Sequence, residues 1–272
     1  MEFIQSVNNP RVKRAVKLLN SSRERRKEQR FVLEGLRLCM DVVRSGLTAE
    51  ELYVTEELMA REPEKINELA AVTESVFLMS RPVAEKLTDT RNPQGICCIL
   101  RTLDKQRDRN KIEKMDESGK YILLENVQDP ANLGAVSRTA EALGLTGIIV
   151  SGGCDIYSPK ALRASMGALL RLSVLETGDI TGTIENAKKN GMKTYASVPD
   201  SRAVSVTDTD FSGGAIVVVG NEANGVTEET LASCQGTVTI PMAGRAESLN
   251  AGAAASILMW EMVRPYENKT EK

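Results

Sequence analysis

The run Ala-Ile-Val-Val-Val at residues 215–219 is the feature that most limits how this chain can fold. Five apolar residues without polar alternation are typical of a strand buried on both faces, as in a parallel sheet covered by helices. Similar runs occur at 121–124 and 147–150, and apolar residues at helical spacing follow them at 130–143 and 159–166. This alternation predicts an α/β fold with a parallel sheet for the second half of the chain.

The first hundred residues also alternate helical and strand-like stretches and predict a smaller α/β unit. The expected strands are 31–33, 52–54, 76–79 and 96–100, and the expected helices are 12–19, 36–43, 56–71 and 82–87, with Pro63 interrupting the third. Residues 104–119 are dense in charge and poor in large apolar residues, which favours an exposed linker. We therefore expect one domain at 1–103 and a second at 120–272.

The final helix, expected at 249–263, is apolar almost all round. Such a helix must be buried on more than one side, either in a large core or at a subunit interface. Ser248 is a good N-cap for it. The longest mostly apolar run without a charge, 251–260, is too short to span a bilayer, and the N-terminus lacks the apolar core of a secretory signal. We expect a cytoplasmic protein with no membrane partner.

The absence of histidine excludes several kinds of active site. A Ser-His-Asp triad, a Cys-His pair and every histidine metal site are ruled out. The five cysteines form no C-x-x-C pair, and they are typical of small buried side chains in a reducing compartment. The sequence therefore predicts no metal site.

Charge is distributed unevenly along the chain. Residues 10–30 hold nine Lys and Arg side chains against two Glu, a net charge of +7 in a chain whose total is −2. A basic stretch on an acidic body indicates a local contact with nucleic acid, although a solvated helix face would have the same composition. The candidate RNA-binding residues are Arg11, Lys13, Arg14, Arg23, Arg25, Arg26 and Arg30.

Three loops that follow expected strands are rich in Gly, Asn and acidic residues, at 125–143, 217–226 and 239–256. Ligands of parallel sheets bind at the carboxyl ends of strands, so these loops are candidates for one site. None of them matches the dinucleotide fingerprint or a P-loop. The residues alone predict a polar site built from three strand ends, without a metal or a histidine base.

The first loop opens a helix, with Asp129 as a good N-cap and Pro130 as its first residue. Gly134 and Arg138 are four residues apart and are expected on one side of that helix, away from its core stripe. A glycine there suggests that a ligand approaches the backbone beside Arg138. The alternative is a surface ion pair between Arg138 and Glu141.

The three loops together resemble, in order, the three motifs of the SpoU/TrmH family of RNA ribose 2'-O-methyltransferases, in the SPOUT superfamily. The matching segments are DPANLGAVSRTA, VVVGNEANGV and IPMAGRAESLNAGAAAS, and the resemblance spans about residues 120–265. The N-terminal part, from NPRVKRAVKLL through FVLEGLRL, is similar to the L30e-like substrate-binding domain of that family.

The resemblance implies a SPOUT-type parallel sheet with a deep trefoil knot, a homodimer formed through the C-terminal domain, and S-adenosylmethionine (SAM) as methyl donor. The positions that match the family's catalytic set are Asn132, Arg138, Glu222, Ser248 and Asn250. The expected cofactor-binding positions are Val219, Gly220, Ile240, Met242 and Leu249, and Arg245 is an expected RNA contact.

The resemblance therefore implies methyl transfer from SAM to a ribose 2'-hydroxyl, with ribosomal RNA favoured as substrate. A tRNA substrate, an enzyme that modifies the target of a ribosomal antibiotic, and a non-catalytic RNA-binding protein of this fold are the alternatives. Because a guanidinium stays protonated, we expect Arg138 to grip the phosphate beside the target ribose and to stabilise charge on the 2'-oxygen, rather than to act as a base. Glu222 is expected to orient Arg138 or the loop.

Overall fold

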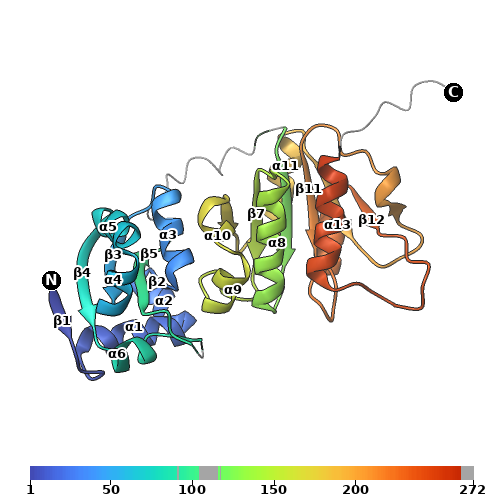
Figure 1. The fold of residues 1–272 in the computed structure, drawn as a ribbon. Helices are drawn as coiled ribbons and strands as arrows, with labels where there is room; N and C mark the ends of the chain where they lie inside the picture. The colour runs from blue at the N-terminus through green and yellow to red at the C-terminus, as the bar shows by residue number, and fades with distance from the viewer. Residues whose placement is uncertain (91, 104–115, 117, 265–272) are drawn as a thin grey trace. The chain divides into compact units, whose positions relative to one another are not determined.

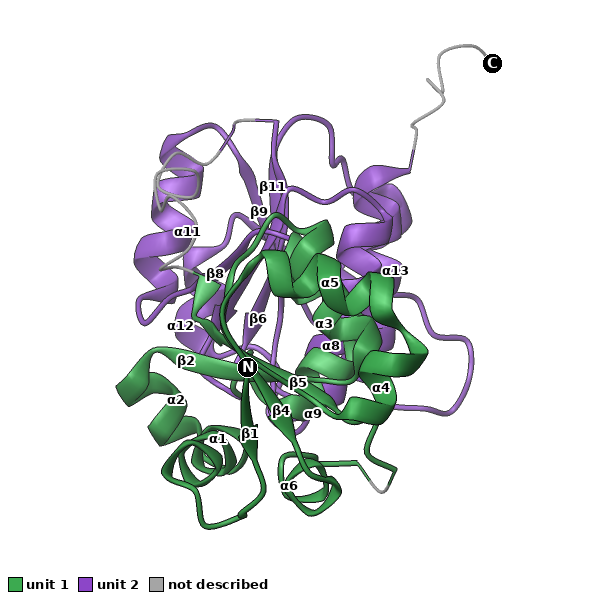
Figure 2. Ribbon diagram, turned by 60° about the vertical axis from the view of Figure 1, so that its left-hand side comes forward, with its two compact units in different colours: residues 1–109, 155–171 green, residues 110–154, 172–272 purple. Residues whose placement is uncertain are grey.

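The computed structural model describes the 272-residue chain except for residues 91, 104–115, 117 and 265–272 (Figure 1). Its contacts divide the chain into two compact units, one of residues 1–109 and 155–171 and the other of residues 110–154 and 172–272 (Figure 2). The expected linker at 104–119 falls almost entirely outside the described residues. Residues 155–171 group with the first unit by their contacts, whereas the sequence placed them in the second domain.

The first unit contains a five-stranded mixed sheet of order β1-β4-β3-β5-β2. Strand β4 pairs in parallel with β1 and β3, whereas β5 pairs antiparallel with β2 and β3. The strands are β1 Glu2–Ile4, β2 Arg30–Glu34, β3 Ala49–Val54, β4 Thr73–Met79 and β5 Ile96–Arg101. The helices are α1 Pro10–Asn20, α2 Ser22–Glu28, α3 Leu36–Arg44, α4 Glu56–Arg61, α5 Pro63–Ala71, α6 Arg81–Lys86, α9 Pro159–Ala164 and α10 Ala168–Arg171.

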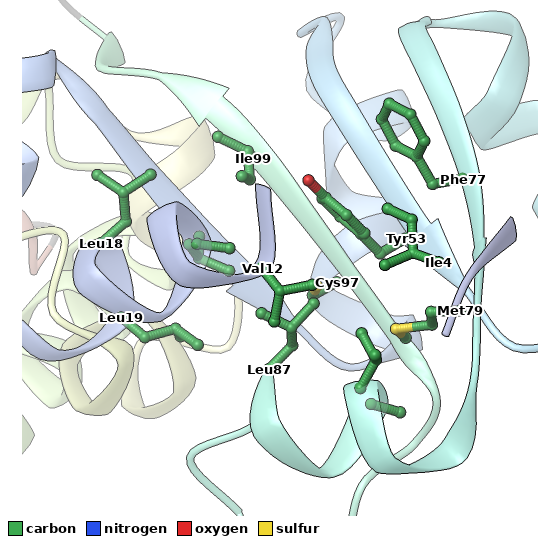
Figure 3. Close-up of a cluster of buried hydrophobic side chains, with 14 residues drawn as sticks. Ile4, Val12, Leu18, Leu19, Tyr53, Phe77, Met79, Leu87, Cys97 and Ile99 are labelled. Atoms are coloured by element: carbon green, nitrogen blue, oxygen red, sulfur yellow. The ribbon is translucent and has the colours of Figure 1, made fainter. Parts of the chain in front are cut away.

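A cluster of buried apolar side chains joins helices α1 and α6 to this sheet (Figure 3). Val12 and Leu18 from α1 pack with Tyr53 from β3 and Ile99 from β5. Side chains alternate along a strand, so Leu52, beside Tyr53, is directed to the opposite face and is also buried. Both faces of β3 are therefore covered, and α1 is held firmly in the unit.

The second unit is built on a seven-stranded parallel sheet of order β10-β12-β9-β11-β6-β7-β8. The predicted α/β class and parallel sheet are confirmed, and the trefoil knot remains a prediction. The strands are β6 Lys120–Glu125, β7 Gly147–Ser151, β8 Val174–Glu176, β9 Lys193–Ser197, β10 Val204–Ser205, β11 Ala215–Val219 and β12 Gly236–Thr239. The helices are α8 Pro130–Ala142, α11 Ile180–Lys189, α12 Glu228–Ser233 and α13 Ala251–Val263, with a short 3-10 helix, η2, at Val206–Asp208.

Helices cover both faces of this sheet, which explains why all five residues of β11 are buried. On one face, Ile184 and Ala187 of α11 pack with Ile216 and Val218 of β11. On the other, α13 contacts β11 and β6 and lies beside α8 (Figure 1). Within the described ranges, every helix is too short or too polar to cross a membrane.

Candidate active site

The first predicted loop leads from β6 into α8 as the sequence indicated. The Asp129 side chain accepts a hydrogen bond from the Ala131 amide at 3.0 Å, and Pro130 is the first helical residue. Gly134, however, is buried, whereas Arg138 is exposed. The prediction that both lie away from the core is therefore wrong for Gly134, which is a packing residue of α8.

The second loop is a tight turn at the end of β11. The Asn221 and Gly225 backbones exchange two hydrogen bonds, of 3.0 and 2.9 Å. A Cβ atom on Gly220 would lie 2.1 Å from the carbonyl carbon of Gly225, well inside van der Waals contact. Gly220 must therefore be glycine for the turn to close, and Glu222 lies within this turn.

Glu222 is held by the first loop. Its Oε2 accepts from the Gln128 amide at 3.1 Å, and its Oε1 accepts from the Asp129 amide at 3.3 Å and from Asn132 Nδ2 at 2.8 Å. Partial burial raises the pKa of this carboxyl, but the hydrogen bonds from Asn132 and the two amides outweigh it, so the pKa is lowered. Glu222 is thus a carboxylate at neutral pH. Two roles were predicted for it, orienting Arg138 or orienting the loop, and its contacts support the second.

The third loop ends at Asn250, which is the N-cap of α13. Its Oδ1 accepts from the Gly252 and Ala253 amides at 2.9 and 3.2 Å, and its Nδ2 donates to Asn132 Oδ1 at 3.0 Å. The expectation that Ser248 caps this helix is wrong, because Asn250 stands one residue before the first helical residue and supplies the capping oxygen itself.

Asn132 therefore connects all three loops. Its amide nitrogen donates to Glu222 and its amide oxygen accepts from Asn250, so both ends of one side chain are occupied. A Cβ on Gly252 would lie 3.3 Å from Asn132 Oδ1, which shows how closely α13 approaches α8 here. We call this hydrogen-bonded set, Glu222, Asn132 and Asn250, the amide chain.

Asn126 is a further member of the site that sequence reasoning missed. It follows β6 with φ of 53°, and its carbonyl accepts from Asn221 Nδ2 at 2.9 Å. Asparagine tolerates this left-handed conformation better than most residues, so an Asn directly after a strand was the available signal.

Two predicted catalytic residues stand apart from the amide chain. Arg138 is six residues beyond Asn132, about 9 Å along α8, and is exposed. It makes no ion pair or hydrogen bond with any other described residue, so the pair with Glu141 does not form among them. Ser248 is exposed in the third loop and likewise contacts none of the amide chain by a hydrogen bond.

The predicted cofactor-binding positions lie in and beside the second and third loops. Val219 and Gly220 are buried, Ile240 and Met242 are half-buried, and Leu249 is 39% exposed. Within the described part of the chain, the backbone of 241–249 makes no hydrogen bond. Free amides and carbonyls beside apolar side chains are what a nucleoside-like ligand requires, so these residues fit one.

The predicted RNA-binding cations in the first unit fall into two groups. Four of them are occupied by carboxylates of the same unit. Arg11 and Arg14 pair with the buried Glu51 at 3.2 and 3.1 Å, Arg25 with Asp155 at 2.7 Å, and Arg30 with Glu50 at 2.5 Å. Arg25 is only 5% exposed.

The other three predicted cations, Lys13, Arg23 and Arg26, are exposed on α1 and α2. They have no ionic partner among the residues described in the structure. Lys17 and Lys27 share these properties and extend the same surface. We call these five residues the open cations.

Comparison with known proteins agrees with this geometry. The model of the SpoU rRNA Methylase family matches residues 119–260, which contain the whole amide chain. This chain belongs to the SpoU rRNA Methylase family. The model of an MRM3-like substrate binding domain matches residues 9–98, so the predicted N-terminal substrate-binding domain is confirmed.

Several relatives match along nearly the whole chain. The 23S rRNA (guanosine(2553)-2'-O)-methyltransferase RlmP of Bacillus subtilis is 28% identical, covering 96% of this chain and 99% of its own length. The AdoMet-bound rRNA methyltransferase from Sinorhizobium meliloti has a TM-score of 0.83 at 27% identity, covering 96% of this chain and 97% of that one. The SpoU methyltransferase AviRb from Streptomyces viridochromogenes, in complex with AdoMet, has a TM-score of 0.83 at 27% identity, covering 94% and 98%.

Proposed function

We propose that this chain transfers a methyl group from SAM to the 2'-hydroxyl of a ribose in ribosomal RNA. The observation that carries the proposal is the amide chain, in which Asn132 ties Glu222 and Asn250 together. The membership of the SpoU family and the names of the relatives support the same reaction. The two solved relatives with bound AdoMet support the choice of donor.

SAM, when bound, supplies an electrophilic methyl group on a cationic sulfur. Val219, Gly220, Ile240, Met242 and Leu249 would hold it, through the free backbone of 241–249 and the apolar side chains. Glu222 contributes a fixed negative charge, which favours a cationic ligand in the site. The amide chain keeps the three loops in register, so the protein's contribution is orientation rather than covalent chemistry.

Arg138 is the group we assign to the RNA. It is exposed and unpaired among the described residues, so its guanidinium is available for a bidentate contact with a phosphate. From there it would stabilise charge that develops on the 2'-oxygen.

This assignment predicts a difference between two substitutions at position 138. Arg138→Ala removes an exposed side chain, so we expect the melting temperature to stay unchanged while turnover falls at least 100-fold. Arg138→Lys keeps the charge but not the planar fork, and we expect a loss of at least 10-fold. Near-normal turnover by Arg138→Lys would contradict the bidentate grip.

The open cations are the RNA contact that we propose for the first unit. Exposed Lys and Arg side chains provide a salt-dependent attraction to phosphates without sequence preference. Selectivity would come from a folded RNA loop, whose unstacked bases can be read.

We also propose a homodimer that covers α13. Leu249, Ile257 and Trp260 are 39%, 38% and 52% exposed, and the latter two lie three residues apart on the helix. A second copy packed there would bury this apolar surface, as the all-round apolar sequence of α13 requires. We place the protein in the cytoplasm, because relatives such as RlmP of Bacillus subtilis are bacterial rRNA methyltransferases.

The test uses purified protein, SAM calorimetry and transfer of labelled methyl groups to total RNA. We expect SAM binding, label in ribosomal RNA, and loss of one ribose methylation in cells that lack the protein. Label in tRNA instead of ribosomal RNA would identify tRNA as the substrate. SAM binding without transfer to any RNA would favour the non-catalytic alternative.

A further inference from the structure

Glu125, the last residue of β6, is a buried carboxylate that the proposed reaction does not use. It is 7% exposed. A buried charge is costly unless it is fully hydrogen-bonded. Its Oε2 accepts from the Thr227 amide at 3.0 Å, and its Oε1 accepts from the hydroxyls of Thr227 at 2.7 Å and Thr230 at 2.8 Å.

These two threonines stand where the second loop ends and regular structure resumes. Thr227 is the N-cap of α12, and its hydroxyl accepts from the Thr230 amide at 3.3 Å. Thr230 is fully buried in the first turn of that helix. The Glu125 carboxylate therefore fixes the position at which the loop of residues 220–226 enters α12.

The rest of that loop is tied to the residues that follow Glu125. At its start, Asn221 donates to the carbonyl of Asn126, and in its middle Glu222 accepts from the amides of Gln128 and Asp129. Segment 125–132 thus holds the loop at its start, middle and end. The contact at the end comes from Glu125, the last residue of strand β6, whereas the others come from residues 126–132, beyond the strand.

We propose that Glu125 is a positioning residue for methyl transfer. Acting through Thr227 and Thr230, it holds residues 220–227 in the conformation in which Gly220 borders the cofactor and Glu222 reaches Asn132. The identity of the ligand in this inference rests on the proposed function. The hold of Glu125 on the loop is independent of that function.

Glu34 in the first unit provides a matched control. It is the last residue of β2, is 9% exposed, and accepts from the hydroxyls of Thr88 and Thr90 and from the Asp89 amide at 2.8 Å. Unlike Glu125, Glu34 also pairs with a cation, Arg163, at 3.6 Å. Glu34→Gln thus perturbs a buried, threonine-bound carboxylate in the unit that lacks the amide chain.

The experiment compares Glu125→Gln, Glu34→Gln and the unchanged full-length chain by thermal melting, SAM calorimetry and amide hydrogen exchange. In Glu125→Gln a side-chain NH₂ would face one of the three donors. We expect faster exchange of the Asn221, Gly225 and Thr227 amides and at least a 10-fold rise in the Kd for SAM. We expect both variants to lower the melting temperature. Glu34→Gln should show neither the faster amide exchange nor the higher Kd.

A second pair of variants covers the case in which Glu125→Gln does not fold. Thr230→Val removes one donor and keeps the side-chain shape, whereas Thr230→Ser keeps the hydroxyl. We expect Thr230→Val to loosen the loop and weaken SAM binding several-fold, and Thr230→Ser to restore both.

Two results would overturn the proposal. One is unchanged exchange at residues 221–227 in Glu125→Gln or Thr230→Val. The other is a loosened loop with an unchanged Kd for SAM. If the unchanged chain does not bind SAM at all, the proposed function fails, and the exchange measurements alone decide whether Glu125 fixes the loop.

Discussion

Asn250 performs two tasks with the two ends of one amide group. Its oxygen caps α13, and its nitrogen donates to Asn132. Both ends are needed in that orientation, because the capping amides of Gly252 and Ala253 require an acceptor. One side chain thereby couples the stability of a helix to the order of the candidate active site.

The two tasks can be separated by substitution. Asn250→Ala removes both, so we expect a loss of about 1 kcal/mol in the free energy of unfolding, together with a large loss of methyl transfer. Asn250→Asp keeps the capping oxygen but places a carboxylate oxygen opposite Asn132 Oδ1. We expect it to retain most of the stability while losing activity, as measured by urea unfolding and methyl-transfer rate.

Equal activity of Asn250→Asp and the unchanged chain would contradict the role of the Asn132 contact. Substitution of Ser248 to Ala is the control for stability, since Ser248 does not cap the helix. It should leave the unfolding free energy unchanged.

Glu222 gives the site a predictable dependence on pH. Its pKa is lowered in the folded chain, so the carboxylate contributes stability that is fully present above the ordinary glutamate pKa of about 4.3. That contribution is lost as the pH falls through the lowered folded pKa. We therefore expect Glu222→Gln to be less stable than the unchanged chain at pH 7, with the difference shrinking below about pH 4.

Urea unfolding of both proteins between pH 3 and pH 8 measures this difference. A gap in stability that stays constant across the range would show that the carboxylate's charge does not matter.

At the scale of elements, the cations of α1, α2 and the start of β2 fall into two groups. The arginines that pair with carboxylates stabilise the first unit, and the open cations face solvent. Arg25, which the charge pattern alone placed with the RNA contacts, is buried, so Arg26 is the informative neighbour for an RNA-binding test.

Reversing charge at Lys13 and Arg26 tests the open cations. We expect weaker RNA binding and a shallower dependence of RNA affinity on salt, by about 2 in the log–log slope, because two phosphate contacts are lost. The Kd for SAM and the melting temperature should not change.

The double variant Arg11→Gln, Arg14→Gln should have the opposite effects on stability and on RNA binding. It leaves the buried Glu51 without its cations, so the melting temperature should fall while the salt slope stays near that of the unchanged chain. Equal salt slopes for both double variants would contradict the division into two groups.

The sequence predicted the elements that carry strong apolar signals. The buried strand 215–219 and the break at Pro63 are confirmed, because a long apolar run and a proline each have a direct local effect. Helix α2 was missed since its sequence, SRERRKE, contains no apolar residue and its only buried side chain is Arg25. Helix α11 was also missed, because only two of its residues are fully buried.

The site was predictable in its parts but not in its connections. The family resemblance supplied Asn132, Glu222 and Asn250, whereas the exchange of capping roles between Ser248 and Asn250 depends on where α13 starts. Both residues are good N-caps by type, so only backbone geometry distinguishes them. The roles of Asn126 and Glu125 depend on contacts with loops about a hundred residues away.

At the scale of the molecule, residues 155–171 are the main departure from the expected organisation. A segment between two neighbouring parallel strands ordinarily crosses over the same sheet. Here it groups with the first unit, where Tyr157 stacks on Phe31 at 4.6 Å and Arg171 pairs with the buried Asp41 at 3.2 Å. Pairs such as Arg25 and Asp155, 130 residues apart, leave no local pattern in a sequence.

The ion pair of Arg25 with Asp155 tests how much this segment stabilises the first unit. Asp155→Asn leaves a buried guanidinium without a counter-ion, although the Leu18 and Leu19 carbonyls still accept from it. We expect a loss of about 3 kcal/mol in the free energy of unfolding. Asp200→Asn, which breaks an exposed pair with Arg202, should leave the melting temperature unchanged.

The grouping of residues 155–171 with the first unit determines how these proteins can be recombined. The chain passes between the units three times, after residues 109, 154 and 171. A chimaera made by exchanging only the N-terminal hundred residues would therefore confront Arg25, Glu34 and Asp41 with a foreign segment. Moving the complete first unit into a relative therefore requires three junctions, so that Arg163 and Arg171 travel with the carboxylates they neutralise.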